Sequence, residues 1–176
     1  QLVSVLSLIG FGSIFFQLEQ SSQILFVFLG LITFFYAIPM GVKMPKNLRS
    51  IGGVKIYIIA LVWAMTTVVL PVFESQQTLV ADPWILMLQR TFIVIVLMLP
   101  FEIRDLDTDQ LHLSTIPQKT GIPYTKIIGY ALLGDTILLE FFKLEFNQDR
   151  FLILVFSVVI LAVFLAKSTK KKSRYY

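Results

Sequence analysis

The chain has 176 residues and a formal net charge of +4; 56% of its residues are hydrophobic and only 15% are charged. Soluble domains average about 45–50% apolar and about 25% charged residues, so this composition excludes an ordinary soluble domain. The chain has no cysteine, which excludes thiolate catalysis, cysteine-ligated zinc and iron–sulfur clusters.

The charged residues gather between long apolar segments. Four segments of the length of a membrane-spanning helix contain no charge: 1–18, 24–42, 56–73 and 151–166. Two weaker segments complete the set: 84–101, interrupted by Arg90, and 124–142, interrupted by Asp135 and Glu140. A spanning helix needs about 20 mostly apolar residues, whereas β-barrel strands need alternating segments of about 10 residues. The sequence therefore predicts an all-α, polytopic transmembrane helix bundle with six spans.

We expect residues 1–176 to form a single domain. Gln1 opens directly into an apolar segment without a basic region or a cleavage site, which is unlike a signal peptide. We therefore expect the chain to begin inside a helix, with further residues upstream.

The loops differ in charge, and this difference predicts their orientation. The loop after the second span contains no acid but four basic residues: Lys43, Lys46, Arg49 and Lys55. The tail 167–174 is also rich in lysine. Because basic loops face the cytoplasm, we expect both segments, and with them the loop 102–122, to be cytoplasmic. The loops 74–83 and 143–150 then face outward.

The loop after the fourth span is acidic and contains the best candidate for chemistry. Asp105 and Asp109 are four residues apart, so on a helix continuing from this span their carboxylates lie on one face. Two such carboxylates suit a hard cation such as Mg²⁺, and the neighbouring Arg104 is placed to contact a phosphate oxygen. An ordinary solvated acidic loop remains the alternative interpretation.

This loop also carries the residues of a recognisable motif. In order, these are Arg104-Asp105-x-Asp107-x-Asp109, Thr115-Ile116-Pro117 and Gly121. The pattern resembles the second aspartate-rich motif of the UbiA-type membrane prenyltransferases, which lies in a cytoplasmic loop between two spans. Upstream, Tyr36 and Lys43 resemble the Tyr-then-Lys segment of the family, so the resemblance covers roughly residues 30–135.

Two features depart from the family pattern. Leu111-His112-Leu113 stands where the family tends to have a glycine and a basic residue, and the first family motif, N-D-x-x-D, does not occur in the 176 residues. We expect the six spans to correspond to the third to eighth of a nine-span fold. On that correspondence the chain is truncated at both ends, and the first motif lies upstream of Gln1.

The resemblance implies a function. Asp105 and Asp109 would bind Mg²⁺ that bridges to a polyprenyl diphosphate, and Arg104 would help neutralise the leaving diphosphate. The implied diphosphate-binding residues are Lys43, Lys46, Arg49 and Tyr36. An allylic cation would then be attacked by a hydrophobic acceptor. The expected partners are these two substrates and membrane lipids, with no nucleic acid.

Two other functions stay open. One is a catalytically inactive UbiA-like subunit of a larger membrane complex. The other is a transporter that uses Arg90, Asp135 and Glu140, which would then line a water-filled path. At about 1.5 Å per helical residue, Arg90 and Asp135 lie at similar depth on consecutive antiparallel helices. Because each alone costs about 2.5–3.5 kcal/mol in a membrane, we expect these two to pair, directly or through water, with Glu140 as the rival partner.

Overall fold

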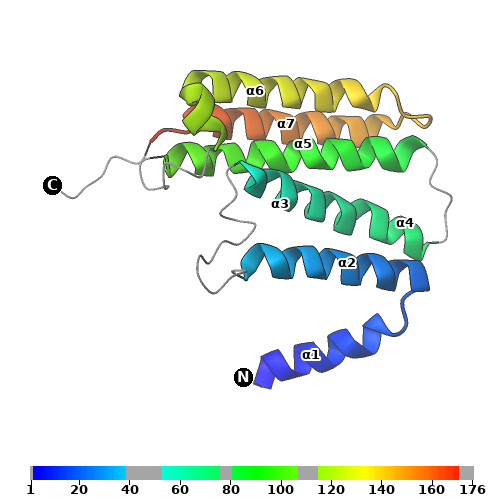
Figure 1. The fold of residues 1–176 in the computed structure, drawn as a ribbon. Helices are drawn as coiled ribbons and strands as arrows, with labels where there is room; N and C mark the ends of the chain where they lie inside the picture. The colour runs from blue at the N-terminus through cyan, green and yellow to red at the C-terminus, as the bar shows by residue number, and fades with distance from the viewer. Residues whose placement is uncertain (1, 39–52, 76–80, 107–114, 171–176) are drawn as a thin grey trace.

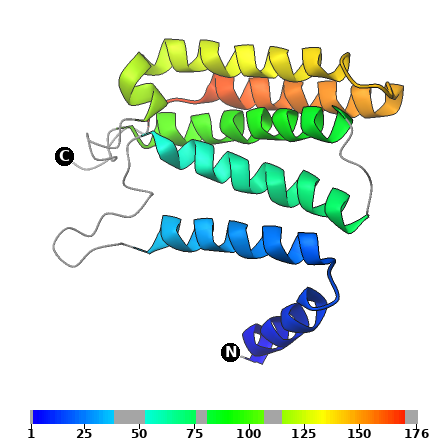
Figure 2. The ribbon, with the colours of Figure 1, turned by 45° about the vertical axis from the view of Figure 1, so that its right-hand side comes forward.

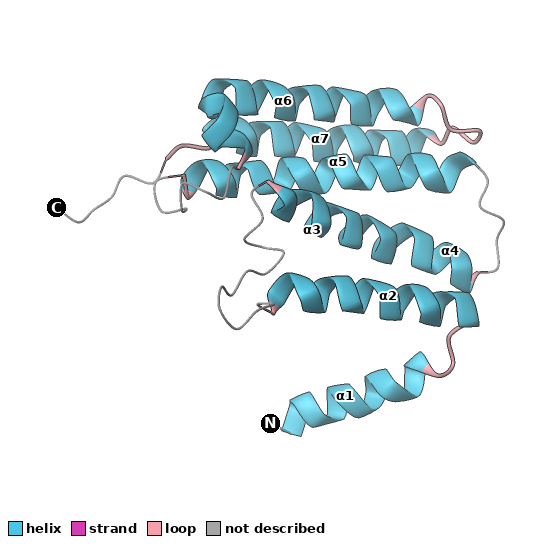
Figure 3. Cartoon of the chain, viewed as in Figure 1, coloured by secondary structure: helices cyan, strands magenta, loops and turns pink. Residues whose placement is uncertain are grey.

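The computed structural model describes residues 2–38, 53–75, 81–106 and 115–170, and these ranges contain helices and no strand. The elements in chain order are α1 (Leu2–Phe15), α2 (Gln20–Ala37), α3 (Val54–Ala64), a π-helical turn (Met65–Val69), α4 (Leu70–Glu74), α5 (Ala81–Arg104), α6 (Ile116–Glu140) and α7 (Gln148–Lys167). Figures 1 and 3 show this all-helical arrangement. The predicted all-α fold is confirmed for the described residues.

Among the described residues, four helical segments are long and apolar enough to cross a membrane. They are Gln20–Ala37, Val54–Glu74, Ala81–Arg104 and Gln148–Lys167. The first and fifth expected spans also form helices, but they differ from these four. α1 has 14 residues, which is short of the roughly 17–25 that cross a bilayer. α6 has 25 residues but carries Lys126, Asp135 and Glu140 in its main part.

The helices lie side by side, and α5 is at the centre of the bundle. It packs against α3 on one side and against α6 and α7 on the other, whereas α2 packs against α4. In both ribbon views α1 and α2 form one edge and α6 and α7 the opposite edge (Figures 1 and 2). α5 and α7 run in the same direction, so both end at the side where α6 begins (Figure 1).

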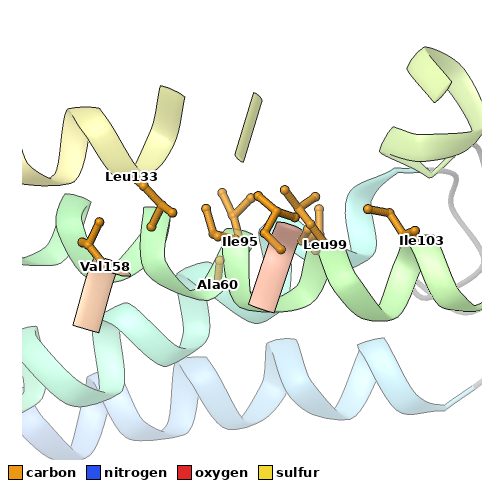
Figure 4. Packing of buried hydrophobic residues seen from close by; sticks show 9 residues of the cluster. Ala60, Ile95, Leu99, Ile103, Leu133 and Val158 are labelled. Atoms are coloured by element: carbon orange, nitrogen blue, oxygen red, sulfur yellow. The ribbon is translucent and has the colours of Figure 1, made fainter. Parts of the chain in front are cut away.

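The core follows one face of α5. The buried positions Ile95, Val96, Leu99 and Ile103 repeat with helical spacing. They contact side chains from three other helices, including Ala60 of α3, Leu133 of α6 and Val158 of α7 (Figure 4). The outer surface of the bundle is apolar as well: Phe16, Phe28, Phe142 and Phe164 are each more than half exposed. An apolar exterior over a small packed core is what a lipid-facing bundle requires.

Gly129 allows α6 to approach α5 and α7 closely. A Cβ added at this position would overlap the Leu165 side chain of α7 and come within 3.0 Å of Leu99 in α5. Leu99 and Leu165 are fully buried. The absence of a side chain at Gly129 therefore sets the spacing of the three helices that surround the candidate site.

Candidate functional site

The end of α5 presents a charged pair. Arg104, the last residue of the helix, donates from Nε to Asp105 Oδ1 at 2.8 Å and from Nη2 to Oδ2 at 3.1 Å. The guanidinium also lies over the Phe101 ring, 5.3 Å from its centroid. Both charged side chains are well exposed. The two-point contact fixes the orientation of the Asp105 carboxylate relative to the helix.

Only part of the predicted metal site falls in the described residues. α5 ends at Arg104. The backbone N–H of Asp105 donates the last hydrogen bond of the helix, to the Phe101 carbonyl at 3.0 Å. Asp109, the predicted second metal ligand, lies outside the described residues, as do Lys43, Lys46 and Arg49. Within the described ranges, no three acidic or histidine side chains gather as a set of metal ligands.

The Thr-Ile-Pro segment forms the beginning of α6. Thr115 is the N-cap residue, and its backbone N–H donates to the Gln118 side chain at 3.0 Å. Pro117 stands in the first turn, where its missing N–H breaks no helical bond. The candidate motif is therefore divided between the end of one helix and the cap of the next.

Gly121 redirects α6. Its φ of 78° and ψ of 163° lie in a region that is open essentially to glycine alone. After it the helix restarts with Pro123 in its first turn, and the Thr125 hydroxyl donates to the Gly121 carbonyl at 2.8 Å. The main helix thus begins where the sequence placed the fifth span. The turns before Gly121 lie at a steep angle to the rest of α6 (Figures 1 and 2).

The two halves of the motif meet at one end of the bundle. Ile103, beside Arg104, is a core residue, and Ile116, beside Thr115, packs against the same core. Apolar burial therefore holds the Arg-Asp and Thr-Ile-Pro segments next to each other. Tyr36 belongs to the last turn of α2 at this same end, but α3 lies between α2 and α5 (Figure 1). The structure does not bring Tyr36 to Arg104.

The sequence interpretation missed one ionisable residue of this end. Glu102 is only 4% exposed, whereas Arg104 and Asp105 are well exposed. Its spacing from Ile95 and Leu99, at seven and three residues, places it on the buried face of α5. That spacing is the signal that would have identified it.

An apolar groove leads away from the Arg104–Asp105 pair between α5 and α7. It encloses about 540 Å³ and is lined by residues of both helices and of the segment after α7. The lining residues are Val96, Leu97, Pro100, Phe101, Arg104, Ile160, Leu161, Phe164, Lys167, Ser168 and Thr169. Its two cationic residues, Arg104 and Lys167, are the last residues of α5 and α7. The groove is therefore apolar along its length and basic at one end, which we call its mouth.

A second polar cluster occupies the opposite end of the bundle. Gln89 of α5 donates to Glu140 Oε2 at 2.8 Å and to the Thr136 carbonyl at 2.9 Å. Lys143 contacts the same carboxylate oxygen of Glu140 at 2.6 Å. Gln89 and Glu140 are 2% and 3% exposed. The ion-pair partner of Glu140 is therefore Lys143, three residues along the chain.

The predicted direct pairing of Arg90 with Asp135 is wrong. Both side chains are exposed, and no ion pair in the described ranges joins them. The predicted depth was right, because the adjacent Gln89 and Thr136 are in contact. One residue along a helix turns a side chain by about 100°, and this rotation takes the two charges out of the helix–helix contact.

The same arrangement speaks against the transporter interpretation. That interpretation requires Arg90, Asp135 and Glu140 to line one path. Glu140 is instead buried against Gln89 and Lys143, whereas the other two side chains are exposed.

Comparison of the chain with protein-family models, with curated proteins and with solved structures finds no match. The resemblance to UbiA-type prenyltransferases therefore rests on the motif residues of the sequence.

Proposed function

We propose that this protein is an integral membrane prenyltransferase of the UbiA type, which transfers an isoprenyl group from a polyprenyl diphosphate to a hydrophobic acceptor. The main support is the local structure of the motif. Arg104 and Asp105 end one helix, Thr115 caps the next, and Gly121 adopts a conformation that only glycine readily takes. The described residues of the motif thus each have a structural role at the same end of the bundle.

The six-span topology and its orientation belong to this proposal. They are supported by a charge difference between the two ends of the described part of the bundle. At the motif end the basic residues are Lys55, Arg104, Lys119, Lys126, Lys167 and Lys170, against Glu102 and Asp105. At the other end the acids are Glu19, Glu74, Asp82, Glu140, Glu145 and Asp149, against Lys143 and Arg150. The positive-inside rule then places the motif in the cytoplasm, where diphosphate substrates are available.

The proposed enzyme depends on Mg²⁺, with Asp105 and Asp109 as ligands. The donor chemistry fits, because Mg²⁺ prefers carboxylate oxygens and substrate phosphates. When bound, the ion supplies positive charge at the leaving diphosphate. Arg104 donates to both oxygens of Asp105. Each carboxylate oxygen keeps a second lone pair, so Asp105 can still bind a metal ion, and the remaining Arg104 N–H groups are available to a phosphate oxygen. Lys43, Lys46, Arg49 and Tyr36 are the further proposed diphosphate-binding residues.

The experiment uses the complete protein in membranes that contain its acceptor. We expect Asp105→Asn and Asp109→Asn each to lower Mg²⁺-dependent transfer from a labelled C20 prenyl diphosphate by about 10²–10³-fold, because each removes charge stabilisation of the leaving group. Asp149→Asn is the matched control, since Asp149 is exposed at the other end of the bundle. Normal transfer by both motif variants would refute the proposal.

The inactive-subunit alternative is favoured by one observation: Arg104 already engages both Asp105 oxygens. It predicts that the wild-type protein neither transfers nor binds the prenyl diphosphate at any Mg²⁺ concentration. Titration of the purified protein with farnesyl diphosphate, with and without Mg²⁺, separates the two functions. Mg²⁺-dependent binding that Asp105→Asn abolishes favours the enzyme.

A further inference from the structure

We propose that the groove between α5 and α7 binds an anionic phospholipid of the surrounding bilayer. One acyl chain lies between the two helices, and the phosphate lies at the basic mouth formed by Lys167 and Arg104. This inference shares the orientation of the bundle with the prenyltransferase proposal but not its chemistry, since it concerns a surface that opens to the lipid.

The shape and size of the groove suit an acyl chain. Its α5 wall runs from Val96 to Arg104, which at about 1.5 Å per residue is about 12 Å of helix. The volume of about 540 Å³ lies within the roughly 300–1,000 Å³ of small-molecule sites. Apart from the mouth, every lining side chain is apolar.

The groove opens sideways. Leu97 and Phe101 on α5 are about half exposed, at 49% and 52%, and Phe164 on α7 is 67% exposed. Both helices are long and apolar enough to span a membrane, so these rims face the region that lipid chains occupy. A bilayer lipid therefore has direct lateral access, whereas a soluble anion would meet an apolar wall.

The mouth carries excess positive charge. Asp105 neutralises Arg104, but Lys167 also lines the groove, together with Ser168 and Thr169. Basic pockets between membrane helices at the cytoplasmic side are the usual sites for anionic headgroups. The charge of the mouth therefore selects an anionic headgroup over a zwitterionic one.

Hydrogen bonds to the carbonyls at the C-terminal end of α7 reduce their repulsion of an anion. The carbonyls of a helix C-terminus ordinarily repel negative charge. Here Lys126 of α6 donates to the Ala166 carbonyl at 2.8 Å, and the Ser168 hydroxyl donates to the Leu165 carbonyl at 2.7 Å. These two contacts satisfy the Ala166 and Leu165 carbonyls and place the Lys126 ammonium at the end of α7.

The test uses the complete protein in nanodiscs that contain equal amounts of phosphatidylglycerol and phosphatidylcholine. In each sample one of the two lipids carries a diazirine on its acyl chain. After irradiation, mass spectrometry maps the labelled peptides. We expect phosphatidylglycerol to label residues 96–104 and 160–169 about fivefold more than phosphatidylcholine, because one basic residue near a membrane surface favours an anionic lipid by about this factor.

Two variants separate the headgroup from the chain. Lys167→Gln should remove most of the preference for phosphatidylglycerol, whereas Leu97→Trp, which fills the groove, should reduce labelling by both lipids. Arg150→Gln is the matched control, since Arg150 is exposed at the other end of α7. Size-exclusion chromatography checks that each variant is folded.

Equal labelling by the two lipids in the wild type, or a preference that survives Lys167→Gln, would overturn the proposal. Labelling spread evenly over the outer helices would overturn it as well, since the groove would then be ordinary lipid-facing surface. Displacement by farnesyl diphosphate without any headgroup preference would assign the groove to a prenyl chain instead.

Discussion

The side-chain amide of Gln89 lies 2.8 Å from the carboxylate of Glu140 and thereby ties the first half of α5 to the last residue of α6. Both side chains are almost fully buried. Lys143 contacts the same carboxylate oxygen, so Glu140 has one neutral and one charged donor. A buried carboxylate that loses a donor is left with part of its desolvation penalty unmet.

Replacing Gln89 should therefore weaken the fold. We expect Gln89→Leu, which keeps a similar size, to lower the free energy of unfolding by about 1–3 kcal/mol. Chemical denaturation in detergent measures the change. Gln148→Leu, at an exposed position at the start of α7, should leave stability nearly unchanged. Equal effects of the two variants would contradict a stabilising role for the Gln89–Glu140 contact.

Arg90 and Asp135 should show no energetic coupling, because their side chains are exposed and do not pair. In a double-mutant cycle, the effects of Arg90→Leu and Asp135→Leu on unfolding should add within about 0.3–0.5 kcal/mol. Thermal unfolding of the wild type, both single variants and the double variant provides the four values needed. A double variant clearly more stable than Arg90→Leu alone would show that Arg90 and Asp135 do interact in the wild type.

The close approach at Gly129 gives a sharp packing prediction. Gly129→Ala should destabilise the protein by about 1–3 kcal/mol, because the added methyl group overpacks the contact with Leu165 and Leu99. Gly134→Ala is the matched control on the same helix, since nothing lies within 4 Å of a Cβ at that position. We expect that variant to be neutral or up to about 1 kcal/mol more stable. The opposite order of melting temperatures would show that α6 does not pack as described.

The orientation of the bundle can be tested with single cysteines, because the chain contains none. In intact cells, Glu145→Cys should react with a membrane-impermeant thiol reagent from outside, whereas Lys119→Cys should react only after the membrane is opened. Both residues are exposed, so a difference in labelling reports on sidedness and not on burial. The reverse pattern would move the Arg104–Asp105 end away from the cytoplasm.

The sequence by itself determined the helical fold and most helix ends. Apolar segments of spanning length predicted the helices, because hydropathy summed over about 20 residues is a property of one continuous segment. One boundary was also visible: the fifth apolar segment was expected to begin at residue 124, and the structure restarts that helix after Gly121. Two expectations were reversed: the charge-free first segment forms a helix of only 14 residues, whereas the weaker fourth segment belongs to a helix long and apolar enough to cross a membrane.

The tertiary structure decided which side chains meet. Arg90 was singled out in the sequence and Gln89 was not. In the structure it is Gln89 that points into the helix–helix contact, whereas Arg90, one position further along α5, is exposed. The groove joins Val96 to Ile160, positions that no local pattern connects. Charge and hydropathy act along the chain and can be read from it, but the face that each helix turns toward its neighbour depends on close packing, such as the contact at Gly129. That contact exists only when α5, α6 and α7 are assembled.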